Sequence, residues 1–142
     1  MMQKRTIFVN SSGWLALYNT NDPNHPAAVQ LWEHLRNQPV RFVVTDYVLD
    51  QVYSALKMFG SLQAAQAVHD LIRNSQLIRF FMTDTVIFDR AWRVFVEDDH
   101  PHWTFTDCVN YSVIQYLGIS EVFTFDSNFS HPGLAIIPGS GQ

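Results

Sequence analysis

Four oxygen-bearing side chains stand in segments suited to metal chemistry. Asn10 and Asp126 each follow a short apolar run that has the composition of a β-strand. Asp107 lies at the start of a helical pattern, and Gln51 lies about one and a half turns into another. Carboxylate and amide oxygens are ligands for hard cations such as Mg²⁺ and Mn²⁺, which promote phosphodiester chemistry. The four residues are therefore candidates for one metal site.

Five short runs, rich in β-branched and aromatic residues, alternate with longer helical patterns and must position these side chains. Three of the runs are nearly unbroken apolar stretches, which is typical of strands covered on both faces. The alternation predicts an α/β fold with right-handed crossovers and a parallel sheet between helices. The predicted strands are Thr6–Val9, Arg41–Val44, Leu77–Phe81, Val122–Phe125 and Leu134–Ile137.

Helical stripes connect these strands. Apolar residues recur at helical spacing within residues 27–35, 48–59, 62–72, 87–95 and 109–117. Gly60 and Gly118 mark the ends of two of these helices. Ligands bind outside the carboxyl ends of strands in such folds, which is where Asn10 and Asp126 are expected.

Residues near helix starts are expected to supply the other side chains of the site. Thr106 and Asp107 open one helix, and Thr45 or Asp46 opens another. Gln51 lies just off the buried stripe of that second helix and is placed to reach across the sheet edge. Side chains from four separate segments are thus expected to converge in one crevice.

Composition limits the class of protein. At 142 residues with 47% hydrophobic residues, the chain fits a single domain over residues 1–138 with a frayed tail at 139–142. No apolar run reaches the ~20 residues of a membrane helix, and the N-terminus has no signal-peptide pattern. A lone cysteine, Cys108, excludes an internal disulfide and suits a cytoplasmic location.

The net charge of −4 argues against bulk electrostatic attraction to nucleic acid. A nucleic-acid substrate would instead be held locally, by a metal or by a few placed cations. Lys57, Arg90 and Arg93 are the cations best placed to contact a phosphate backbone.

Five pieces of the chain, in this order and spacing, resemble the PIN-domain family and most closely its VapC-type toxin ribonucleases. They extend from Ile7 to Ile137, and no single piece is specific alone. The pieces are IFVNSSGWLALYN, NHPAAVQLW, VTDYVLDQVYSAL, WTFTDCVNYSVIQYLGI and VFTFDSNF. The resemblance implies a three-layer α/β/α PIN-like fold with a five-stranded parallel sheet. It also implies an RNA substrate, a homodimer, a small antitoxin partner, and one or two divalent metals, Mg²⁺ or Mn²⁺.

The resemblance also assigns the site residues. The family's first acid falls on Asn10, with a small hydroxyl companion at Ser12, and its helix glutamate falls on Gln51. Its third and fourth acids match Asp107 and Asp126. Ser12 and Thr106 are candidates for orienting water or phosphate. The four acid positions are the candidate catalytic and metal-binding residues.

Two of these four positions carry amides, which is a departure from the family pattern. Asn10 and Gln51 keep the shape and one carbonyl oxygen of Asp and Glu but lose the negative charge. A unit charge and a divalent ion ~4 Å apart interact by about 8 kcal/mol at an effective dielectric constant near 20, before desolvation is subtracted. Metal binding is therefore expected to be weakened and catalysis impaired. Each change needs a single nucleotide substitution, so natural drift and deliberate inactivation both account for the pair.

Other residues have simpler interpretations. Asp107 alone is typical of a helix cap and Asp126 of a turn, and only their sequence context favours a site. Asp46 and Asp50 are interpreted as a cap and a solvated helix face. Cys108 is expected to be a small buried residue.

Three functional hypotheses follow. The first is a metal-dependent PIN/VapC endoribonuclease with impaired catalysis. The second is a non-catalytic PIN-like module that binds RNA or an antitoxin partner. The third is another Mg²⁺-dependent phosphohydrolase on a similar sheet.

The histidines around His100 and His102 lack the helical spacing of a zinc site, and Ser12 lacks a nucleophile elbow.

Overall fold

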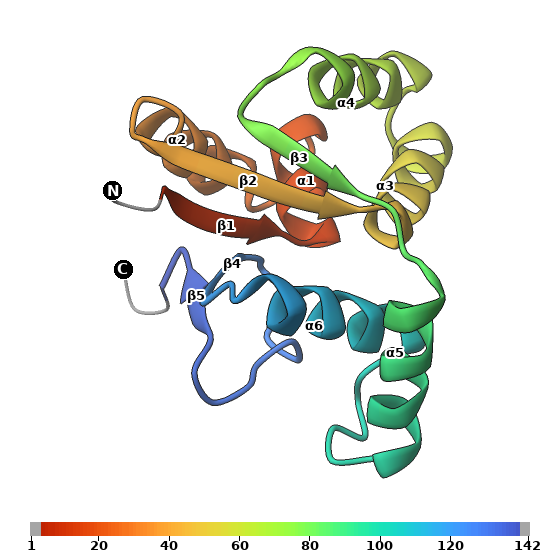
Figure 1. Ribbon diagram of the computed structural model, residues 1–142. Coiled ribbons are helices and arrows are strands. Elements are labelled where there is room, and N and C mark those ends of the chain that lie inside the picture. Colours follow the sequence, from red (N-terminus) through yellow and green to blue (C-terminus); the bar gives the residue numbers. More distant parts are fainter. Residues whose placement is uncertain (1–3, 140–142) are drawn as a thin grey trace.

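Five parallel strands form one sheet in the order β3-β2-β1-β4-β5 (Figure 1). The structure is a computed structural model that describes residues 4–139. All five strands lie where the sequence predicted them, with small shifts at the ends. They are β1 (Arg5–Val9), β2 (Val40–Thr45), β3 (Ile78–Phe81), β4 (Glu121–Phe123) and β5 (Ala135–Ile137). Apart from Gly139, the tail predicted at 139–142 lies outside the described residues.

Six helices connect the strands, and the sequence predicted five of them. The missing one is α1, whose eight residues include Gly13 and show no apolar stripe. Gly60 and Gly118 cap α3 and α6 as predicted, and Gly118 does so in the left-handed conformation at φ 67°. The helices are α1 (Ser11–Tyr18), α2 (His25–Leu35), α3 (Asp46–Phe59), α4 (Leu62–Asn74), α5 (Thr85–Glu97) and α6 (Phe105–Leu117).

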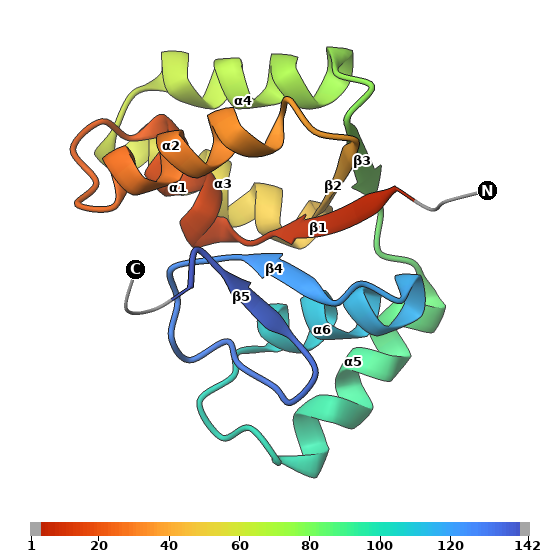
Figure 2. The ribbon, with the colours of Figure 1, turned by 90° about the vertical axis from the view of Figure 1, so that its left-hand side faces the viewer.

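The helices form a layer on each side of the sheet, as Figure 2 shows. On one side, Trp32 of α2 stacks on Phe42 of β2 with ring centroids 4.4 Å apart. On the other side, Thr45 at the end of β2 donates a hydrogen bond of 2.8 Å to Asn110 of α6. The predicted three-layer α/β/α arrangement is therefore confirmed. None of the helices in residues 4–139 has the length and apolar character needed to cross a bilayer.

Helix α1 packs very closely on the sheet through Gly13. A Cβ atom added there would lie 2.9 Å from the backbone oxygen of Phe123 and 3.2 Å from Cγ1 of Val9. Both neighbours belong to central strands, which cannot move away without disturbing the sheet. Because Asn10 and Ser12 lie in the same short segment, this contact also fixes the position of two predicted site residues.

We expect Gly13→Ala to lower the free energy of unfolding by about 1–3 kcal/mol, because overpacking forces backbone shifts at the β1–α1 junction. Urea unfolding followed by circular dichroism measures the change. Gln30→Ala, on the exposed surface of α2, is the control and should leave stability nearly unchanged. A Gly13→Ala protein as stable as the parent would mean that the approach of α1 to β4 is not tight.

Candidate metal centre

Asn10 directly follows β1 and begins α1. Its Oδ1 atom accepts a hydrogen bond of 2.8 Å from the backbone N–H of Ser11, and its backbone N–H donates to the Phe123 oxygen at 3.0 Å. The residue is only 4% exposed. Its side chain therefore lies at the carboxyl edge of the two central strands, as predicted.

Gln51 reaches the same edge from α3. The Ser11 hydroxyl donates a hydrogen bond of 2.5 Å to Oε1 of Gln51. Ser11 therefore connects Gln51 to Asn10, since its backbone N–H contacts one amide and its hydroxyl the other. The sequence pointed to Ser12 as the hydroxyl companion, whereas the residue that joins the two amides is its neighbour.

A buried polar chain, which sequence reasoning missed, holds Asn10 from the other side of the sheet. Thr45 Oγ1 donates to Oδ1 of Asn110 at 2.8 Å, and Nδ2 of Asn110 lies 3.5 Å from Oδ1 of Asn10. Thr45 and Asn110 are both fully buried. The available signal was a polar residue three positions after Asp107, flanked by the apolar Val109 and Tyr111.

Asp107 lies in the first turn of α6 and forms a capping box with Thr104. Its carboxylate accepts from the Thr104 N–H at 2.9 Å, while its own N–H donates to the Thr104 hydroxyl at 3.1 Å. Burial raises the pKa of the Asp107 carboxyl, and the nearby Asp126 carboxylate raises it further, although the Thr104 hydrogen bonds lower it. Asp107 is thus both a helix cap and one of two mutually repelling carboxylates.

Asp126 lies in a turn after β4, slightly farther along than predicted. The strand ends at Phe123 rather than Phe125, because the chain turns after the Thr124 N–H has donated to Ile137. The Asp126 carboxylate accepts from the Asn128 N–H at 3.0 Å, which stabilises the turn. The Asp126 N–H donates to the hydroxyl of the buried Thr124 at 3.0 Å.

Ser12 connects this turn to α1. Its Oγ lies 2.9 Å from the Thr124 hydroxyl and accepts a hydrogen bond of 2.8 Å from the Phe125 N–H. The Ser12 hydroxyl therefore holds the backbone that precedes Asp126. Thr106 is half-buried beside Asp107. The predicted roles of Ser12 and Thr106 in orienting water or phosphate remain predictions.

The four candidate side chains offer only oxygen atoms as metal ligands. Two carboxylates, Asp107 and Asp126, lie close enough to repel each other, and a cation between them would relieve that repulsion. The amide oxygens of Asn10 and Gln51 complete a set that suits a hard divalent ion with several water ligands. Residues 4–139 contain no group of three or more His, Cys, Asp or Glu side chains able to hold a metal. The set therefore fits such an ion, but with a low negative charge.

Several alternative residues lie outside this arrangement. Asp46 does not cap α3, since Thr45 does, and its carboxylate instead accepts from the N–H and hydroxyl of Thr83 at 3.0 and 2.6 Å. Asp50 is exposed, as expected. Cys108 is buried as predicted, and burial followed by the Asp107 charge raises the pKa of its thiol to about 11. His100 stacks on Trp103 in the loop before α6.

Comparison with known proteins identifies the family. The PIN domain matches residues 7–133. The 23S rRNA-specific endonuclease VapC20 of Mycobacterium tuberculosis is 30% identical over 127 residues, which cover 89% of this chain and 94% of VapC20. The similarity extends over the whole region that carries the candidate metal centre.

Solved structures agree with this assignment. The crystal structure of M. tuberculosis VapC20, described as a sarcin-ricin loop cleaving toxin, has a TM-score of 0.77 and 29% identity, covering 87% of this chain and 92% of that one. VapBC2 from Rickettsia felis, bound to a promoter DNA fragment, has a TM-score of 0.67 at 10% identity, with 92% and 96% coverage. FitAcB from Neisseria gonorrhoeae has a TM-score of 0.63 at 12% identity, with 92% and 95% coverage. At such low identity, the VapBC2 and FitAcB structures show the fold alone. The predicted resemblance is confirmed, and the chain belongs to the PIN-domain family, within its VapC toxin branch.

Proposed function

We propose that this chain is a metal-dependent endoribonuclease of the VapC type whose catalysis is impaired by amides at two metal-binding positions. One observation carries the proposal. Ser11 connects Asn10 and Gln51 at the carboxyl edge of the sheet, Asn110 of the Asp107 helix contacts Asn10, and Ser12 contacts Thr124 before Asp126. These contacts support one site for four positions that are far apart in sequence.

Asp107 and Asp126 would be the charged ligands of this cation, and Asn10 and Gln51 its neutral ones. PIN/VapC proteins generally use a divalent metal, and we infer Mg²⁺ or Mn²⁺ from the oxygen ligands. When bound, such an ion supplies Lewis-acid activation of water and neutralises phosphate charge. The Thr104 hydrogen bonds orient the Asp107 carboxylate, and the Thr124 and Asn128 contacts orient the turn that carries Asp126.

The lost charges account for the proposed impairment. Both amide oxygens accept the same hydrogen bonds that carboxylate oxygens would, so the substitutions keep the shape of the site. Each missing charge removes an attraction of about 8 kcal/mol at ~4 Å and an effective dielectric constant near 20, before desolvation. The charges that remain at the site, those of Asp107 and Asp126, repel each other less than four acids would. The amides therefore weaken metal binding while easing the folding of the site.

A second candidate function is a non-catalytic PIN-like module that binds RNA or an antitoxin. Residues 4–139 offer no cluster of three acidic, histidine or cysteine ligands, which is the observation that favours this alternative. Both functions share the same fold and RNA as a ligand. They differ only in whether phosphodiester cleavage occurs.

RNA and an antitoxin are the partners that related proteins indicate for this family. VapC20 is named for 23S rRNA, so we propose ribosomal RNA as the first substrate to test. An apolar groove of about 300 Å³ between α3 and α4 supports an antitoxin contact, and the exposed Phe59 and Leu62 lie at the α3–α4 corner beside it. We also propose a cytoplasmic location, since the single cysteine is an unpaired buried thiol.

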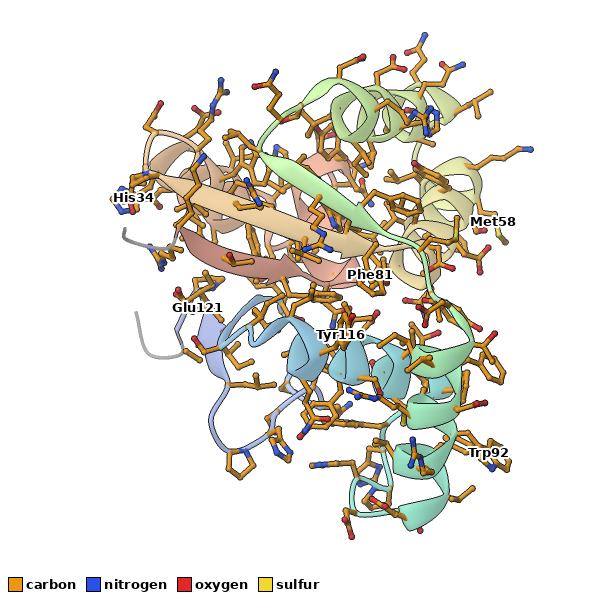
Figure 3. The ribbon with its side chains drawn as sticks, viewed as in Figure 1. His34, Met58, Phe81, Trp92, Tyr116 and Glu121 are labelled. Carbon is orange, nitrogen blue, oxygen red and sulfur yellow. The ribbon has the colours of Figure 1, made fainter. Side chains whose placement is uncertain are left out.

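The outer face of α5 supports a homodimer. Phe88, Trp92, Phe95 and Val96 are 45%, 54%, 43% and 54% exposed, and Trp92 points away from the molecule (Figure 3). A contiguous exposed apolar face marks an interaction surface. Because a helix face can pack against its own copy about a two-fold axis, a second copy of this chain is the proposed occupant.

We expect Asn10→Asp with Gln51→Glu to bind Mn²⁺ at least ~100-fold more tightly than the parent. This gain is about a third of the interaction energy of one restored charge before desolvation is subtracted. Isothermal titration calorimetry measures the affinity directly. The control is Asn74→Asp with Gln63→Glu on α4, which adds the same charge far from the site. Equal gains in both proteins would show that net charge alone changes the affinity.

We expect the same Asn10→Asp, Gln51→Glu protein to cleave ribosomal RNA in the presence of Mg²⁺ or Mn²⁺, at a rate at least ~100-fold above the parent. Gel analysis of RNA from purified ribosomes, with and without EDTA, measures this cleavage. Adding Asp126→Asn should abolish the gain. Tight metal binding without cleavage would reject the nuclease and favour the binding module.

We expect Trp92→Glu to lower the molar mass in solution from that of a dimer to that of a monomer, because it places a charge in the apolar α5 face. Size-exclusion chromatography with light scattering measures the mass. Gln30→Glu, on the exposed surface of α2, adds the same charge away from α5 and should leave the dimer intact. A parent chain that is monomeric at high concentration would contradict the homodimer.

A further inference from the structure

The sheet face that packs on α6 is left uncovered near its β3 edge. Phe81 of β3 pairs with Thr45, which hydrogen-bonds α6, so Phe81 and, by strand alternation, Arg79 lie on the α6 side. Arg79 is exposed, and so is Arg41 on the neighbouring β2. Figure 1 shows β2 and β3 facing the viewer with α6 below them. This part of the sheet therefore presents its side chains to solvent.

Two arginines and two aromatic rings form a continuous strip on this face. The Arg79 guanidinium lies 5.9 Å from the centroid of the Phe81 ring, and the Arg90 guanidinium lies 5.6 Å from that of Tyr116. The Phe81 and Tyr116 rings meet edge to face, 6.1 Å apart and inclined at 68° (Figure 3). We name Arg79, Phe81, Tyr116 and Arg90 the Arg–aromatic strip.

The strip is locally positive on a chain whose net charge is −4. Within residues 4–139 the ion pairs are Arg5–Glu121 and Arg36–Glu33, so neither arginine of the strip is neutralised by a carboxylate. The guanidinium group stays charged at all physiological pH values and pairs with phosphate through a planar fork of donors. The strip therefore offers two free anion-binding groups beside two aromatic rings.

This combination matches single-stranded nucleic acid. Exposed aromatic faces stack bases regardless of sequence, and neighbouring arginines contact the phosphates between them. Tyr116 is 56% exposed, which leaves its ring available to a base. We propose that the Arg–aromatic strip binds a single-stranded segment of RNA next to the candidate metal centre. The inference rests on the proposed function only in taking RNA as the ligand.

The strip lies within reach of the candidate metal centre. Phe81 is the direct strand neighbour of Thr45, about 4.8 Å away, and Thr45 belongs to the chain that holds Asn10. Tyr116 lies on the helix that begins beside Asp107, about 13 Å farther along its axis. The strip and the candidate metal centre are therefore close enough for one RNA segment to reach both.

A protein partner fits the strip less well. The larger groups of exposed apolar residues lie on the outer face of α5 and at the α3–α4 corner. Phe80 and Met82, the exposed neighbours of Phe81, alternate with it and so point to the other side of the chain. The strip instead combines cations with aromatic rings and contains no aliphatic side chain. Its charge complements the phosphate backbone of RNA.

The test measures RNA binding without cleavage. Fluorescence anisotropy in EDTA, with a short uridine-rich single-stranded RNA, compares the parent chain with Arg79→Gln, Arg90→Gln. We expect the double variant to bind at least ~10-fold more weakly at low salt, with a salt slope that is smaller by about 0.7 for each lost phosphate contact. Tyr116→Leu should weaken binding by about 10-fold, whereas Tyr116→Phe should stay within about twofold because the ring is kept.

The matched control is Arg36→Gln with Arg73→Gln, which removes the same charge from helices on the other side of the sheet. Thermal unfolding should be unchanged in all variants, because the substituted side chains are exposed. Binding by the strip variants equal to that of the control, or no RNA binding by the parent, overturns the proposal. An unchanged RNA affinity with a changed molar mass would also overturn it, and would assign the strip to a protein contact.

Failure of the strip is distinguishable from failure of the nuclease. If Asn10→Asp, Gln51→Glu cleaves RNA while the strip variants bind RNA as tightly as the parent, the nuclease proposal is retained and the RNA-binding role of the strip is rejected. If the strip variants lose RNA affinity while Asn10→Asp, Gln51→Glu does not cleave RNA, the RNA-binding role of the strip is retained and the nuclease proposal is rejected.

Discussion

The hydrogen bonds around the Oδ1 atom of Asn10 connect the helices on the two sides of the sheet at the candidate metal centre. This buried oxygen accepts the Ser11 N–H that begins α1 and lies 3.5 Å from the Asn110 amide of α6. Buried polar groups must be paired, so the surrounding chain is arranged to supply these donors. What the arrangement requires at position 10 is an acceptor oxygen, and an amide supplies one as well as a carboxylate does.

Shape and charge are therefore separable at this site. Hydrogen bonds determine where the side chains of Asn10 and Gln51 lie, whereas the missing charges determine how strongly a cation is held. A negative charge at this site is costly when no cation is bound. Burial and the neighbouring Asp126 raise the pKa of the Asp107 carboxyl, which means that they disfavour its charged form. Four carboxylates in the same space would repel one another more strongly, so the amides are expected to favour the stability of the metal-free fold at the expense of metal affinity.

The sequence predicted the features that depend on local patterns. Apolar runs and helical stripes located five strands and five helices, and Gly60 and Gly118 located two helix ends. It missed α1 because a short helix that packs through Gly13 needs no apolar stripe. A tertiary contact, not local propensity, holds that helix in place.

The candidate site likewise divides into residues that local sequence patterns predict and residues that only tertiary contacts bring together. The four candidate metal positions were predicted from strand ends, helix starts and family resemblance, whereas the residues that hydrogen-bond them were not. Asn110 and Thr124 reach the site only through the sheet topology, which pairs residues more than 60 positions apart. Asp126 was placed at a strand end because Thr124 and Phe125 have strand-like composition. The strand ends at Phe123, and the Phe125 and Asp126 N–H groups donate to the side chains of Ser12 and Thr124 instead of a neighbouring strand.

The separation of shape from charge bears on how the molecule holds RNA. The net charge of −4 gives little bulk attraction to RNA, and the proposed loss of two charged ligands would reduce what a bound cation adds to RNA affinity. The Arg–aromatic strip contributes its affinity independently of the metal, since its guanidinium groups are charged and unpaired within the described residues. Under the proposed function, a chain with amides at positions 10 and 51 and an intact strip is expected to bind RNA but to cleave it poorly. The two candidate functions then share one fold and differ in the charge carried at these two positions.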